Sequence, residues 1–117
     1  TPYTCRRQRQ MCIRDSLCTV PDEDTAERIA GTLVSEKLAA CVNIVPGISS
    51  VYHWKGAVER DRELLLIIKS GQGAYPALES RVRALHPYEL PEVIAVPIGI
   101  GLPEYLDWIT KSLKTIS

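Results

Sequence analysis

The chain has 117 residues with 14 Lys plus Arg and 14 Asp plus Glu, so its formal net charge at pH 7 is zero. That balance argues against a partner such as nucleic acid or an anionic membrane surface. Hydrophobic residues make up 45% and charged residues 24%, which is typical of one globular domain. No apolar run approaches the roughly 20 residues of a membrane-spanning helix, and the N-terminus has no secretory signal pattern. We therefore expect a cytoplasmic protein.

Residues 1–16 differ in character from the rest of the chain. They contain four arginines and only scattered apolar residues, and no helical or strand period runs through them. We expect a disordered or non-native basic segment here, with a nucleic-acid arm as the alternative. Residues 11–16 resemble peptides that arise when sequencing-adapter DNA is translated, which favours a non-native origin. Residues 17–117 are expected to form the folded domain.

The four cysteines are Cys5, Cys12, Cys18 and Cys41. Their spacing matches no zinc module, because there is no C-x-x-C pair. A cytoplasmic domain with this much aliphatic content does not need a disulfide framework. We therefore expect four free thiols.

The regular pattern begins with a strand end at residues 17–20, stopped by Pro21. Asp22 is a suitable N-cap for the helix that follows, and acidic residues in its first turn favour the positive end of the helix dipole. Apolar residues then recur at helical spacing to about Lys37. They are Ala26, Ile29, Ala30, Leu33 and Val34.

A long β-hairpin is predicted next, from residues 40–54 and 58–69 with a turn at Lys55-Gly56. Pro46-Gly47 predicts a bulge or bend within the first strand. Residues 64–68 of the second strand are apolar on both faces. Helices of the same domain can cover one face only, so self-association is the simplest way to cover the other.

The rest of the chain predicts a second helix, a short strand and a third helix. The second helix should end at His86, because a residue before proline avoids the helical region. Residues 93–98 are expected to be a buried strand, and Pro103 suits the first position of the last helix. The resulting order predicts an α+β fold of the ferredoxin-like type, βαββαβ plus a C-terminal helix.

Five segments in this order resemble the CutA family of divalent ion tolerance proteins. They are residues 18–23, 38–44, 52–56, 86–92 and 105–108. The resemblance covers about residues 17–114 and implies a homotrimer assembled through the long hairpin. It also implies an association with copper and other divalent cations, with ligands at Cys18 and His86. Some members carry a second histidine, and this chain has Leu85 in its place.

Cys18 and His86 are therefore the first candidates for metal ligands, together with Glu89. A thiolate and an imidazole suit copper or zinc. Two ligands are too few for a structural site, so Glu89, water or a neighbouring subunit would have to complete it. The alternatives are structural: Cys18 as a small buried hydrophobe, and His86 as a residue at the negative end of a helix dipole.

Three functions follow from this reading. The first is a homotrimer that binds divalent metal ions, copper above all, in metal tolerance. The second is a regulator of the PII type that binds a small anion or nucleotide between subunits, which a basic cleft around Lys69 and Arg83 would favour. The third is a scaffold trimer without a ligand. Lys69 and Glu63, charged residues on the apolar strand, are expected to form a structural ion pair or to line a cleft between subunits. No enzyme motif occurs in the sequence, so no catalytic residue is predicted.

Overall fold

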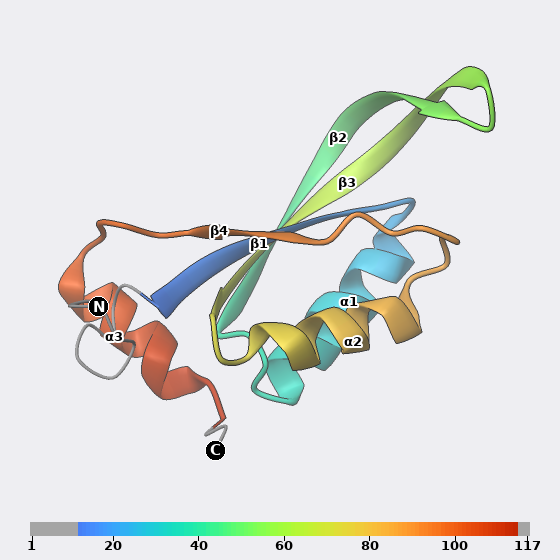
Figure 1. Ribbon diagram of the computed structural model, residues 1–117. Helices are drawn as coiled ribbons and strands as arrows, with labels where there is room; N and C mark the ends of the chain where they lie inside the picture. Colours follow the sequence, from blue (N-terminus) through green and yellow to red (C-terminus); the bar gives the residue numbers. More distant parts are fainter. Residues whose placement is uncertain (1–11, 115–117) are drawn as a thin grey trace.

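A computed structural model describes residues 12–114 and contains one four-stranded antiparallel sheet with the strand order β2-β3-β1-β4. In chain order the elements are β1 (Ile13–Val20), α1 (Glu23–Ser35), β2 (Cys41–Trp54), β3 (Ala57–Gly71), α2 (Tyr75–Leu85), β4 (Ile94–Pro97) and α3 (Pro103–Ser112). Figure 1 shows α1 and α2 together on one side of the sheet and α3 at one end. This arrangement confirms the predicted ferredoxin-like fold with a C-terminal helix.

Strand β1 begins at Ile13, four residues earlier than the sequence pattern predicts. Ile13 is 2% exposed and packs with Leu106 and Ile109 of α3. Arg14 and Asp15 obscure the strand pattern, although Asp15 forms an ion pair with Lys69. Part of the atypical segment thus belongs to the sheet. Residues 1–11 lie outside the described residues, so the character and origin of that part stay predictions.

The cysteines correct one expectation. Cys12 is disulfide-bonded, whereas Cys18 and Cys41 are free thiols. Disulfide formation depends on the distance and direction between two Cα–Cβ vectors. Sequence spacing does not determine either quantity, so the expectation of four free thiols was wrong for Cys12.

The core lies between the sheet and the two helices α1 and α2. The Oδ1 atom of Asp22 accepts a hydrogen bond of 2.8 Å from the Thr25 amide, which confirms the predicted N-cap. Alternate residues of β3 and β1 point toward the helices and are buried, while Val34 at the end of the predicted apolar stripe is 42% exposed. The main cluster contains Cys18, Val20, Ala26, Ile29, Leu33, Leu38, Ala39, Leu64, Leu66, Ile68, Leu78 and Val82.

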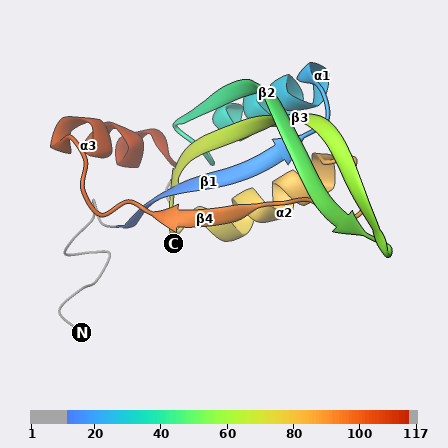
Figure 2. The ribbon, with the colours of Figure 1, turned by 90° about the horizontal axis from the view of Figure 1, so that it is seen from above.

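Strands β2 and β3 form a hairpin that projects well beyond the rest of the fold (Figures 1 and 2). Lys55 and Gly56 have φ angles of 52° and 83°, as a tight hairpin turn requires. The pairing register shifts between Val45 and Ile48, so the predicted bulge at Pro46-Gly47 is confirmed. A bulge of this kind bends its strand locally, and Figure 1 shows a curved hairpin.

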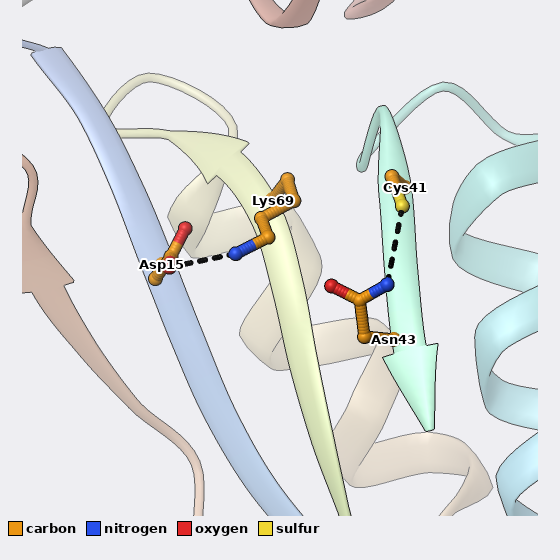
Figure 3. A network of polar contacts seen from close by, with 4 residues as sticks. All are labelled: Asp15, Cys41, Asn43 and Lys69. Atoms are coloured by element: carbon orange, nitrogen blue, oxygen red, sulfur yellow. Dashed lines mark hydrogen bonds and ion pairs between the residues drawn. The ribbon is translucent and has the colours of Figure 1, made fainter. Parts of the chain in front are cut away.

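Among the elements that the structure describes, α3 covers the second face of the sheet, and it does so near Ile13. Leu17 and Ile67 lie side by side on this open face, and Ile94 of β4 follows in the same row. Ile94 is 49% exposed, so the prediction of a buried β4 is wrong for the single chain. β4 is an edge strand, and no other element of residues 12–114 covers this face of it. One polar row crosses the open face, where Lys69 pairs with Asp15 at 3.0 Å (Figure 3).

Candidate functional site

A groove of about 740 Å³ lies between the outer part of the hairpin and the segment that connects α2 to β4. Figure 1 shows this connecting segment beneath the projecting hairpin. The residues that line the groove are Thr19, Ser50, Val51, Tyr52, His53, Trp54, Glu63, Pro87, Tyr88, Glu89, Leu90 and Glu92. Three of them are glutamates and three are tyrosine or tryptophan, and none is lysine or arginine. We name it the acidic–aromatic groove.

Glu63 is the buried carboxylate of the groove. It is 6% exposed, and its Oε2 atom accepts a hydrogen bond of 2.7 Å from the Tyr88 hydroxyl. Burial raises the pKa of Tyr88, and the hydrogen bond and charge of Glu63 raise it further. Tyr88 therefore stays protonated and remains the donor. The bond connects the hairpin to the segment after α2, two elements far apart in sequence.

His86 ends α2, as predicted, and is also buried, with 7% of its surface exposed. Its Nε2 atom lies 2.7 Å from the carbonyl oxygen of Thr19, which can only accept a hydrogen bond. Its Nδ1 atom lies 3.1 Å from the backbone nitrogen of Tyr88, which can only donate one. The imidazole therefore carries its proton on Nε2 and uses its lone pair on Nδ1 for Tyr88. Neither nitrogen is available to a metal in this arrangement.

Cys18 lies on the helix-covered face of β1 and is fully buried. Burial raises the pKa of its thiol from 9.0 to about 12, with further contributions from the charges of Glu92 and Glu63. A protonated thiol is a poor metal ligand, because the thiolate is the form that binds. The packing matches the structural alternative for this residue, a small buried hydrophobe.

Glu89, the third predicted ligand, is exposed and lines the groove. Between residues 12 and 114, no three His, Cys, Asp or Glu side chains are grouped in a way that could hold a metal ion. Within one subunit these three residues do not fit a metal centre. The Cys18 thiol is protonated, both His86 nitrogens are in hydrogen bonds, and Glu89 is a surface carboxylate. A metal site at Cys18, His86 and Glu89 stays a prediction.

The sequence predicted only part of the surroundings of the charged residues Lys69, Glu63 and Arg83. Lys69 does form the expected ion pair, with Asp15. Glu63 has the Tyr88 hydroxyl as its partner and forms no ion pair among residues 12–114. Arg83 is exposed on α2, on the opposite side of the sheet from Lys69, so these two residues form no basic cleft within one subunit. Tyr88 was not predicted as a site residue. The available signal was Glu63 itself, because a carboxylate beside an apolar strand needs a partner.

The fold and the groove define the class of protein: a ferredoxin-like α+β domain with a projecting β-hairpin and an acidic–aromatic groove beneath it. The family model of the CutA1 divalent ion tolerance protein matches residues 16–112. The chain belongs to this CutA1 family.

Individual relatives agree with this assignment. The divalent-cation tolerance protein CutA of Thermus thermophilus is 55% identical over 96 residues, which cover 82% of this chain and 93% of that protein. The solved structure of the Thermus thermophilus protein superimposes on this chain with a TM-score of 0.86 at 52% identity. The match covers 87% of this chain and 99% of the chain in that structure. Mouse CutA is 46% identical over 99 residues, 85% of this chain and 56% of its own length. The chain thus spans about half the length of this relative.

The compartments of relatives differ. The rice protein CutA 1, 53% identical over 82% of this chain and 54% of its own length, is chloroplastic. A CutA structure from Archaeoglobus fulgidus, 39% identical with a TM-score of 0.84, is of a periplasmic protein and covers 87% of this chain and 99% of its own. Within residues 12–114, no helix has the length and apolar character to cross a bilayer. The cytoplasmic location stays a prediction.

Burial of Cys18 predicts very slow alkylation. Raising the thiol pKa from 9.0 to about 12 lowers the thiolate fraction at pH 8 about a thousandfold. Iodoacetamide treatment followed by peptide mass spectrometry should leave Cys18 unmodified in the folded protein and label it fully in guanidinium chloride. Labelling of the folded protein should increase as the pH rises toward 12, because the thiolate fraction increases. Equal labelling rates in folded and denatured protein at pH 8 would contradict the buried, protonated thiol.

Proposed function

We propose that the protein acts without catalysis in divalent-cation tolerance, as a homotrimer that binds the cation weakly. Membership of the CutA1 family supports the role in tolerance. The observation that carries the cation binding is the acidic–aromatic groove. It is lined by the buried Glu63 and the exposed Glu89 and Glu92, with no lysine or arginine among the lining residues. Carboxylates in such an arrangement attract cations and repel anions.

The open face of the sheet supports the trimer. Leu17, Ile67 and Ile94 form an apolar row on a face that α3 leaves uncovered beyond Ile13. An apolar sheet face of this kind is normally covered by a second layer. Copies of the same chain supply that layer in the proposed assembly, and the projecting hairpin of each copy reaches its neighbour.

Copper is the first metal to test, as the sequence resemblance implies. Cys18 and His86 become ligands only if the thiol ionises and the His86 ring breaks its hydrogen bond with Thr19 or Tyr88. Glu89 and Glu92 are exposed and need no rearrangement. We propose that the exposed carboxylates make the first contact with the cation, and that a neighbouring subunit completes the coordination.

The regulatory alternative, with a small anion or nucleotide between subunits, has less support, because the groove has three carboxylates and no lysine or arginine among its lining residues. The scaffold alternative has no specific observation in its favour. It predicts that no variant of the candidate ligands changes metal uptake.

The experiment is native mass spectrometry of the purified protein with and without Cu²⁺ or Zn²⁺. The proposal expects a trimer that gains about one metal per subunit. The double variant Glu89→Gln, Glu92→Gln should lose that gain if the carboxylates bind first. The double variant Cys18→Ser, His86→Ala should lose it if the buried pair is essential, and Glu36→Gln, on the exposed Arg81 ion pair, is the matched control. A trimer that takes up no metal would overturn metal binding, and a monomer would overturn the assembly.

A further inference from the structure

We propose that the acidic–aromatic groove binds an organic ammonium ion that carries an apolar or aromatic group. This binding goes beyond the proposed role in metal tolerance, because the ligand is an organic cation. Its ammonium group would pair with Glu63, and its apolar part would lie against the aromatic side chains of the groove.

Glu63 provides the first argument. Its side chain is almost completely buried, yet no lysine, arginine or histidine within residues 12–114 forms an ion pair with it. Tyr88 supplies one neutral hydrogen bond to Oε2, and no described residue donates to Oε1. Buried carboxylates are normally compensated by a cation or by several donors. Oε1 is not among the enclosed atoms of the described residues that lack a partner, so it stays open toward the groove. The wall of this groove therefore has a negative charge that no basic side chain of residues 12–114 neutralises in an ion pair.

The surroundings strengthen this negative potential. Glu92 lies at 3.5 Å from the Thr19 hydroxyl, and Glu89 also lines the groove. Glu63, Glu89 and Glu92 thus place three carboxylates around one groove. An anionic ligand would meet repulsion from all three carboxylates, whereas a cation is favoured.

The aromatic side chains distinguish an organic cation from a metal ion. Tyr52, Trp54 and Tyr88 line the groove together with Val51 and Leu90. Aromatic faces attract ammonium groups and also bury apolar surface. The Lys55 Nζ atom already lies 5.6 Å from the centroid of the Trp54 ring, so this ring interacts with an ammonium group of the protein itself. A metal ion would use only the carboxylates and gain little from these aromatic and apolar side chains, because it needs oxygen, nitrogen or sulfur ligands.

The size of the groove supports the same class of ligand. A volume of about 740 Å³ is far larger than one metal ion requires and lies within the range of small-molecule sites. The open side of the groove admits a ligand from solvent, and the Tyr88–Glu63 hydrogen bond connects its two walls. The buried carboxylate, the aromatic lining and the volume of the groove thus all favour an amphipathic ammonium ion as the ligand.

The test uses benzylammonium chloride as the probe and benzyl alcohol as its uncharged counterpart. The full chain is first treated with EDTA, so that no bound metal contributes. Trp108 lies in α3, away from the groove, and its replacement in a Trp108→Phe background leaves Trp54 as the only tryptophan. Titration of the Trp54 fluorescence should then saturate with benzylammonium at a dissociation constant of about 1 mM and not respond to benzyl alcohol.

Three variants test whether the charge of Glu63 or the shape of the groove is responsible for binding of benzylammonium. Glu63→Gln should weaken binding at least about tenfold, because it removes the buried charge. Tyr88→Phe keeps the carboxylate and should retain binding, and Glu36→Gln on the distant Arg81 ion pair should have no effect. Circular dichroism checks that each variant is folded.

Three results would overturn the proposal. Equal responses to benzyl alcohol would mean an apolar groove only, and this comparison needs no variant. Unchanged affinity in folded Glu63→Gln would remove the role of the buried carboxylate. A response found only after the subunits are separated would mean that a neighbouring copy fills the groove. None of these results depends on metal uptake, so they leave the proposed role in metal tolerance to its own test.

Discussion

Replacement of Ile67 by aspartate is expected to convert the proposed trimer into monomers. Ile67 lies in the middle of the open face of β3, directly opposite Leu17 of β1 and Asn43 of β2. In the proposed assembly each copy of this residue contacts another subunit. A buried carboxylate without a partner costs several kcal/mol, and the symmetry of a trimer repeats that cost three times.

Light scattering coupled to gel filtration measures the outcome. The unaltered protein should have three times the 13.0 kDa chain mass, and Ile67→Asp should have the mass of one chain. Ile67→Leu, which keeps volume and apolarity, is the matched control and should remain trimeric. Far-UV circular dichroism distinguishes dissociation from unfolding. A trimeric, folded Ile67→Asp protein would show that the subunits meet elsewhere.

Truncation of Leu66 to alanine is expected to lower the free energy of unfolding by about 3 kcal/mol. Leu66 is the neighbour of Ile67 in β3 but points to the other face, where it is fully buried under α1 and α2. Leu-to-Ala changes at such sites lose burial and leave a cavity, at a cost of about 2–5 kcal/mol. The expected loss is a large fraction of the stability of a domain of this size.

Urea titration at a fixed protein concentration measures this loss, because association contributes to the stability of an oligomer. Val34→Ala is the control: Val34 lies on α1 but is 42% exposed, so its truncation should change the free energy of unfolding by less than about 0.5 kcal/mol. Equal losses for the two variants would contradict the described core. Because Leu66 faces the helices and Ile67 does not, Leu66→Ala should remain trimeric.

The elements that depend on local periodicity and turn chemistry could be predicted from the amino-acid sequence alone. The Asp22 cap, the bulge at Pro46-Gly47 and the turn at Lys55-Gly56 all lie where the residue types predict them. Each depends on backbone preferences that act over a few residues. The order of these elements then predicted the ferredoxin-like fold, and five short segments predicted the CutA family.

Errors arose where the outcome depends on residues distant in sequence. Ile13 belongs to a strand because it pairs with Gly71 and packs under α3. The charged residues Arg14 and Asp15 interrupt the local strand pattern, so the sequence alone did not predict this. Exposure of β4 depends on whether a second layer covers the sheet, which local pattern cannot indicate. A disulfide at Cys12 likewise depends on a distance in space.

The candidate site was decided almost wholly by tertiary structure. Cys18 and His86 could be chosen as potential ligands from residue type and family resemblance. Only the fold shows the thiol beneath the helices and both His86 nitrogens in hydrogen bonds with Thr19 and Tyr88. The acidic–aromatic groove exists because the hairpin curves over the segment after α2 and brings Glu63 to Tyr88, 25 residues away. The availability of a side chain for chemistry depends on its solvent exposure and its partners, and long-range packing determines both.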